Sequence, residues 1–158
     1  DHVAPTYGLE SYGLFRSDGS PRPAATAYRV AVERLSGFRR VHHTVHPTYH
    51  LVTFVAATAV THVAWARRAE PVIVRVVANP GAKSASLVDQ HGTVKQLVPE
   101  AGEYRLELTA ADCLEDSSEC VVGGEPQLLV EHLGCDPSRL EHQRKCVLWL
   151  RAGEGAVG

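Results

Sequence analysis

The sequence predicts a mainly β protein, an antiparallel β-sandwich preceded by one amphipathic helix. Residues 71–108 hold four short runs rich in β-branched and other apolar residues, separated by turn signals. In the last run, Tyr104, Leu106 and Leu108 alternate with charged residues, which is the period of a strand with one solvated face. The helix is predicted from residues 24–35, where apolar side chains recur at a spacing of three to four.

The predicted helix follows a stretch rich in Gly, Ser, Pro and Tyr that is expected to be mainly loop. Pro23 fits the first turn of a helix, and Gly37 is suited to its C-terminal end. A helix of this kind needs a surface to pack on, because a single amphipathic helix is marginal in water. Its expected apolar face consists of Ala24, Tyr28, Ala31, Val32 and Leu35.

Seven runs are predicted to be strands, and a hairpin is expected around Gly92 because a short glycine-bearing link joins two of them. A further strand-like run, Cys146–Leu150, follows a possible short polar helix near the C-terminus. Residues 38–50 are expected to form a connector. The predicted strands are residues 51–55, 61–66, 71–77, 84–89, 93–98, 103–108 and 127–132.

Composition excludes several classes of function. The chain has 158 residues, of which 44% are hydrophobic and 22% charged, as in an ordinary globular protein. A net charge of −2 gives no electrostatic footprint for nucleic acid or an anionic membrane, so neither partner is expected. No apolar run approaches the roughly 20 residues that span a bilayer. The chain contains no Met, which fits a processed protein or the C-terminal piece of a longer one.

The four cysteines are expected to be free thiols or to form disulfides, which would suit an exported protein. Proximity favours two pairs, although four cysteines allow three connectivities: Cys113 with Cys120, and Cys135 with Cys146.

Two groups of residues could instead hold a metal, but neither prediction is favoured, and no cofactor is expected. Zinc could be bound by Cys135, His142 and Cys146 with His132 nearby, yet no spacing is a CxxC. The connector is dense in histidine, and Pro47 argues against the helix that would align three of them. On a strand, His42, His46 and His50 would also share a face. A solvated connector is the favoured interpretation of His42, His43, His46 and His50.

Residues 12–28, Tyr-Gly-Leu-Phe-Arg-Ser-Asp-Gly-Ser-Pro-Arg-Pro-Ala-Ala-Thr-Ala-Tyr, resemble the end of a (β/α)8-barrel glycoside hydrolase. In that family the eighth strand leads through a GLxRxDGxPKPA turn into the last barrel helix. Arg22 stands where lysine is also common. A small C-terminal β-sandwich often follows, and the remainder of this chain is similar to one. Its matching points are Trp65, residues 87–89 with Gly92, Gly102 with Tyr104, and residues 122–131.

The resemblance implies three parts: residues 1–37 from the barrel end, residues 38–133 as the sandwich, and residues 134–158 as a cysteine-containing tail. It also implies that both catalytic carboxylates lie upstream, so that this chain alone is inactive. The implied partners are the remainder of the barrel and a carbohydrate. Tyr7, Glu10 and Tyr12 could line the substrate site, although a solvated loop glutamate and barrel packing are simpler roles for Glu10 and Tyr12.

Two other functions remain open from the sequence. One is a non-catalytic carbohydrate-binding module, which would need a row of exposed aromatic side chains. The other is a protein–protein interaction domain, in which a separate partner would cover the apolar face of the helix. Arg16 and Asp18 are expected to fix the turn before the helix by hydrogen bonding.

Overall fold

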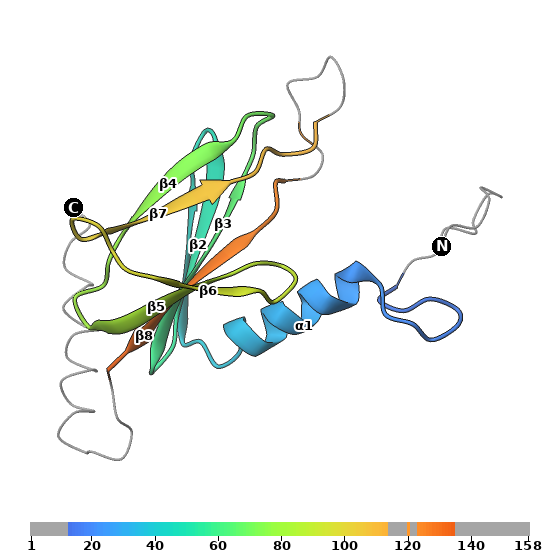
Figure 1. Cartoon of the computed structure of the whole chain (residues 1–158), viewed down its shortest axis with the longest axis horizontal. Helices are drawn as coiled ribbons and strands as arrows, with labels where there is room; N and C mark the ends of the chain where they lie inside the picture. The colour runs from blue at the N-terminus through green and yellow to red at the C-terminus, as the bar shows by residue number, and fades with distance from the viewer. Residues whose placement is uncertain (1–12, 114–119, 121–122, 135–158) are drawn as a thin grey trace.

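The computed structural model of the protein describes residues 13–113, 120 and 123–134. In this part of the chain one helix precedes eight strands, so the predicted mainly β fold with one helix is confirmed (Figure 1). The elements are α1 (Pro23–Leu35), β1 (Arg40–Val45), β2 (Tyr49–Val55), β3 (Ala59–Ala66), β4 (Val72–Val77), β5 (Ala82–Val88), β6 (Val94–Leu97), β7 (Glu103–Leu108) and β8 (Gln127–Leu133).

The strands form two antiparallel sheets of unequal size. The larger sheet has six strands in the order β1-β2-β3-β8-β5-β6, and the smaller pairs β4 with β7. The chain changes sheet twice between residues 71 and 108, since β5 and β6 belong to the larger sheet and β4 and β7 do not. The four consecutive strands predicted there are therefore present but divided between two layers.

The main core lies between the two sheets. We call the side of the large sheet that meets the small sheet its β4 face, and the opposite side its α1 face. Alternation in β7 points one set of side chains into this core and leaves the charged set outside. The buried residues of this core are Ala64, Ala66, Val74, Val76, Ala85, Tyr104, Leu106, Leu108 and Leu129.

A smaller core lies on the α1 face, where α1 packs against β5 and β8. Val30 is the buried residue of the helix, and it packs with Val88, Leu128 and Val130. The helix lies close to the β5–β6 hairpin: a Cβ built on Gly92 would be 3.3 Å from Val30 Cγ2. Gly92 also has a φ of +85°, which a glycine tolerates, so the predicted hairpin glycine serves both turn and packing.

The prediction of a connector over residues 38–50 is wrong. This segment contains β1 and the start of β2, which pair as an antiparallel hairpin with Val45 opposite His50. Val41, Thr44 and Val45 are β-branched and favour a strand, and the histidines between them do not prevent pairing. The seven predicted strands all occur, with bounds within two residues of those predicted.

Candidate functional site

The turn before α1 is held as the sequence predicted. The Arg16 guanidinium donates to the Pro21 carbonyl at 2.9 Å, and the Ser20 amide donates to Asp18 Oδ1 at 2.8 Å. Hydrogen bonds from Ser20 lower the pKa of Asp18 below its ordinary value. The predicted substrate residues Tyr7, Glu10 and Tyr12 lie outside the described residues.

The helix leaves one apolar side uncovered. Val30 faces the sheet, whereas Tyr28 and Val32, two residues to either side and therefore about 160° round the helix, are 61% and 50% exposed. Tyr28 and Val32 belong to the apolar face predicted from the sequence. Leu35 of that face packs against the smaller core, whereas no described residue covers Tyr28 and Val32, which lie on the side of α1 turned away from the sheet.

The edge strand β1 also presents apolar residues to an uncovered side. Its register with β2 and β3 aligns His43 with Val52 and Val63, so His43 lies on the α1 face. Val41 and Val45 alternate with it onto the same face and are 54% and 56% exposed. The opposite face of β1 carries Arg40, His42 and Thr44, so the strand is most apolar on a side with no second layer among the described residues.

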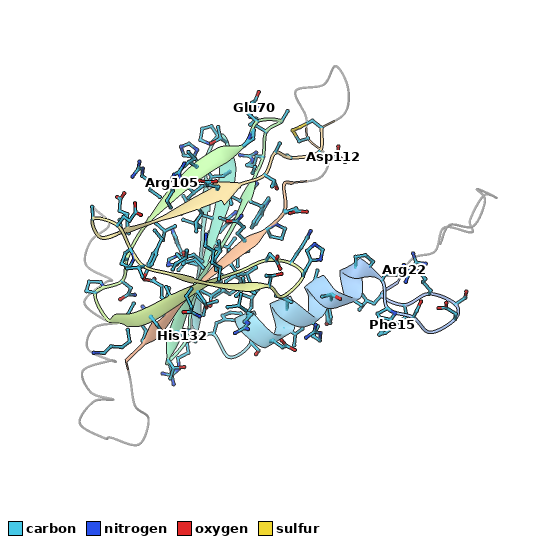
Figure 2. The ribbon with its side chains drawn as sticks, in the orientation of Figure 1. Phe15, Arg22, Glu70, Arg105, Asp112 and His132 are labelled. Carbon is cyan, nitrogen blue, oxygen red and sulfur yellow. A yellow bond between two sulfur atoms is a disulfide. The ribbon has the colours of Figure 1, made fainter. Side chains whose placement is uncertain are left out.

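These residues define a candidate docking surface on the α1 side of the molecule. Phe38 joins it, since its ring packs edge-on against Phe54 of β2 at a centroid distance of 5.2 Å. Figure 2 places Phe15 near the start of α1. Of the ten strongly exposed large hydrophobic side chains in the described part of the chain, six lie between residues 15 and 45. We call these six the docking surface: Phe15, Tyr28, Val32, Phe38, Val41 and Val45.

An aromatic stack lies beside this surface. The His50 ring stacks on Trp65 at 4.8 Å and on His43 at 5.1 Å, and His43 Nε2 is 2.9 Å from His50 Nδ1. Burial lowers the pKa of His50 below its ordinary value, and the charges of Arg67 and His43 lower it further. The stack therefore favours a neutral His50.

The structure does not arrange the histidines as a metal site. The expectation that His42, His46 and His50 share a face is wrong, because His42 points to the β4 face and His43 is the partner of His50. His46 stacks on Tyr49 instead, at 4.4 Å. Within residues 13–113, 120 and 123–134, no group of three or more His, Cys, Asp or Glu side chains is placed to hold a metal.

A buried polar network crosses the main core, and the sequence did not reveal it. Glu131 of β8 has no exposed side-chain surface. Its Oε1 accepts the Asn79 amide at 2.8 Å and its Oε2 lies 3.2 Å from His62 Nε2. The Tyr104 hydroxyl also donates to Glu131. Burial raises the pKa of Tyr104 above its ordinary value, and the charge of Glu131 adds to the effect. The network links the two sheets through β8, β3 and β7.

The predicted disulfide between Cys113 and Cys120 is present, and Figure 2 shows it near Asp112. It closes the loop between β7 and β8. Cys135, His142 and Cys146, the residues of the second cysteine pair and of the zinc alternative, lie outside the described residues. The helix that the structure describes is too short and too polar to cross a membrane.

The sequence matches no protein-family model and has no match among curated proteins. The fold does resemble solved structures. One is a family 39 glycoside hydrolase from the gut symbiont Bacteroides cellulosilyticus, with a TM-score of 0.56 and 25% sequence identity over 77% of this chain. Another is a GH30 endoxylanase from Clostridium papyrosolvens, with a TM-score of 0.55 and 14% identity over 73% of this chain.

The chain spans only 22% of the first of these structures and 29% of the second. Its structural neighbours are thus glycoside hydrolases several times its length, and the chain is related in fold to part of them. The disulfide and this fold both fit an extracellular protein.

Proposed function

We propose that this chain is the C-terminal portion of a glycoside hydrolase. Residues 1–37 would supply the last strand-to-helix segment of a (β/α)8 barrel, and the β-sandwich would be a structural accessory domain packed on that barrel. The observation that supports this most directly is the docking surface, whose exposed apolar residues lie on α1, on the α1 face of β1 and in the segments before and after the helix.

The physical reason is that α1 carries apolar residues on two sides. One side is used within this chain, by Val30 against β5 and β8. The other, with Tyr28 and Val32, is what a barrel helix needs when it packs on a neighbouring barrel strand or helix. In an isolated domain these side chains would add little to stability, because each half-exposed large apolar side chain forgoes burial worth about 1 kcal/mol.

The proposed docking also explains why β1 is more apolar on its α1 face than on its opposite face. In the proposed arrangement the parent barrel covers Val41 and Val45 from the side on which α1 lies, and His50 is buried in its neutral form. The two catalytic carboxylates would lie in the upstream barrel strands, and the carbohydrate substrate would be bound there. Export of the parent enzyme is part of the same proposal.

The first test is the reading frame upstream of Asp1. We expect several hundred residues with repeating strand–helix patterns and two glutamates or aspartates at strand ends. A reading frame that begins close to Asp1, or that encodes an unrelated fold, would refute the proposal. The isolated chain should hydrolyse no aryl glycoside; turnover that survives Glu10→Gln would place an active site elsewhere in this chain.

The second test addresses the docking surface in the parent enzyme. Changing Tyr28 and Val32 together to Asp should lower the free energy of unfolding by about 3 kcal/mol or more, because two carboxylates would replace buried apolar contacts. Heat inactivation of the glycosidase measures this loss. Ile73→Asp on β4 is the matched control, since Ile73 is 53% exposed but lies on the small sheet. Equal effects of the double variant and the control would contradict the docking role.

A further inference from the structure

The charged residues of this chain are distributed unevenly. Residues 34–69 contain five arginines and five histidines but no aspartate or glutamate. All 18 carboxylate side chains lie elsewhere in the chain, together with 11 of its 16 lysines and arginines. The net charge of −2 therefore conceals a cationic region, which comprises the end of α1, the strands β1, β2 and β3, and the turns between them.

Two of these arginines are held at the turn between β1 and β2. Arg67 Nη1 donates to the His46 carbonyl at 3.0 Å, and Arg68 Nε donates to the Pro47 carbonyl at 3.2 Å. The Arg67 amide also donates to the Thr48 carbonyl at 2.8 Å, which fixes the end of β3 against this turn. Both guanidinium groups therefore contact the same turn, and their charges are concentrated at the tip of the hairpin.

His46 adds a third donor at this tip. Its Nδ1 accepts the Thr48 amide at 3.4 Å and lies 3.0 Å from the Thr48 hydroxyl, so in the neutral ring the proton is on Nε2. The side chain is exposed, and Nε2–H is on the opposite edge of the ring from the bond to Thr48. We call Arg67, Arg68 and His46 the cationic turn.

The arginines of the cationic turn have no carboxylate partner among the residues that the structure describes. Arg75 and Arg105 on the small sheet each form an ion pair with a glutamate, whereas Arg67 and Arg68 form none. Both are exposed. Like charges on one turn repel each other, and a bound anion relieves this repulsion. A guanidinium has five N–H donors in a fork that matches an oxyanion, so each arginine keeps donors after bonding the turn.

Carboxylates do occur near the cationic turn. Glu70 follows Arg68 by two residues, and the Arg68 carbonyl accepts the Ala111 amide at 2.8 Å, next to Asp112. Neither Glu70 nor Asp112 forms an ion pair with an arginine of the turn. Residues 114–119 contain three further carboxylates and lie outside the described residues.

The cationic turn favours one class of ligand. A neutral sugar has no charge to complement the two guanidinium groups, whereas a uronic acid or a sulfated sugar supplies an oxyanion. Because the two groups bond different carbonyls, they suit a chain with an anionic group on each unit better than one free ion. Nucleic acid suits the turn less, since its affinity comes from many phosphate contacts and carboxylates outnumber basic residues outside residues 34–69.

We propose that the cationic turn binds the acidic groups of an anionic polysaccharide, either uronic acid carboxylates or sugar sulfates. Arg67 and Arg68 each hold an oxyanion through the guanidinium N–H groups that do not bond the turn, and His46 donates through Nε2–H. The oxyanion site follows from this chain alone, whereas its assignment to a polysaccharide rests on the proposed function. Its role is to anchor the parent enzyme to an acidic polymer.

NMR titration of the full 158-residue chain tests the proposal, with trigalacturonate and sulfated cellotriose as probes and cellotriose as the neutral control. The ring resonances of His46 should shift with at least one anionic sugar. Those of His91, which is exposed on the β5–β6 hairpin, should not. The probe that binds more tightly identifies the anionic group. Raising the salt concentration from about 0.05 M to about 0.5 M should remove most of the shift, because salt screens exposed charges.

Two double variants separate this site from a general effect of charge. Arg67→Gln/Arg68→Gln should weaken binding by about tenfold, since an exposed ion pair contributes up to about a factor of five. Arg75→Gln/Arg105→Gln is the matched control, because these arginines are opposite each other on β4 and β7 and each is paired with a glutamate. It removes the same charge and should leave the affinity unchanged. The His46 shift in the unmodified chain tests the site even if the first variant does not fold.

Several results would overturn the proposal. One is that neither anionic sugar shifts the His46 resonances, as expected if residues 114–119 already neutralise the turn; another is an equal loss of affinity in both double variants. A DNA duplex that binds more tightly than either sugar would assign the turn to nucleic acid instead. The reading frame upstream of Asp1 separates the two proposals. A glycosidase parent without sugar binding refutes the cationic site alone, and sugar binding without such a parent refutes the proposed function alone.

Discussion

Replacing Glu131 by alanine should lower the free energy of unfolding by about 3–5 kcal/mol, because each buried polar group left without its partner costs about 1–3 kcal/mol. The side chain is fully buried, and its loss strands three groups: the Asn79 amide, His62 Nε2 and the Tyr104 hydroxyl. Of these groups Tyr104 is the most deeply buried, whereas His62 is partly solvated and loses less when its partner is removed. The total loss of stability should therefore lie near the middle of the range of about 3–5 kcal/mol.

Urea denaturation followed by circular dichroism measures the effect. With an m-value of about 2 kcal/mol/M, the midpoint should fall by about 2 M. Glu107→Ala removes a carboxylate from the exposed face of β7 and should change stability by no more than about 0.5 kcal/mol. A loss below about 1 kcal/mol in Glu131→Ala would show that the network contributes little to holding the sheets together.

Tyr104→Phe provides a second test of the network in case Glu131→Ala does not fold. It removes only the hydroxyl and should cost about 1 kcal/mol. Glu131→Gln retains an acceptor for Asn79 and should cost less than alanine. In the double-mutant cycle of Tyr104→Phe with Glu131→Gln, the two effects should not add, because the residues share a hydrogen bond. Strict additivity would contradict a shared network.

Two further predictions concern titration and covalent links. Since the folded-state pKa of Tyr104 lies above its ordinary value of 10.0, the unfolded chain loses this proton first, and stability should fall as the pH rises above about 10. Tyr104→Phe should flatten that decline in urea titrations at successive pH values, and an unchanged slope would contradict it. Reducing the Cys113–Cys120 disulfide should lower the unfolding free energy by about 2.5 kcal/mol, as expected for so short a loop. A Cys113→Ser/Cys120→Ser variant should show the same loss of unfolding free energy without reductant. An unchanged urea midpoint in that variant would show that the disulfide does not contribute to stability.

Local pattern was enough to predict seven of the eight described strands but not their sheets. Alternation of Tyr104, Leu106 and Leu108 shows which side of β7 is buried, and Gly92 marks the hairpin between β5 and β6. Neither signal contains information about the partner strand, because period-2 alternation is the same in either sheet. The division of four consecutive strands between two layers is a tertiary property that only packing decides.

Only part of the docking surface could be predicted from the sequence, for a related reason. The apolar face with Tyr28 and Val32 was visible in the sequence, whereas the burial of Val30 on the other side of the helix was not predicted. Which side meets the sandwich depends on the position of β5 and β8, which helical periodicity does not encode. Glu131 was missed because a glutamate late in a strand is ordinarily solvated. The only hint was that it shares a strand face with Leu129, which is buried.

The division of the strands between sheets also bears on how the chain folds. Residues 78–102 separate β4 from β7, and closing a loop of this length costs about 3 kcal/mol of chain entropy. A two-stranded sheet does not recover that cost alone. The intervening residues form β5 and β6 in the large sheet, so their pairing shortens the distance that β7 must search. We therefore expect β4 and β7 to meet only after the β5–β6 hairpin has formed, and the two sheets to fold as one cooperative unit.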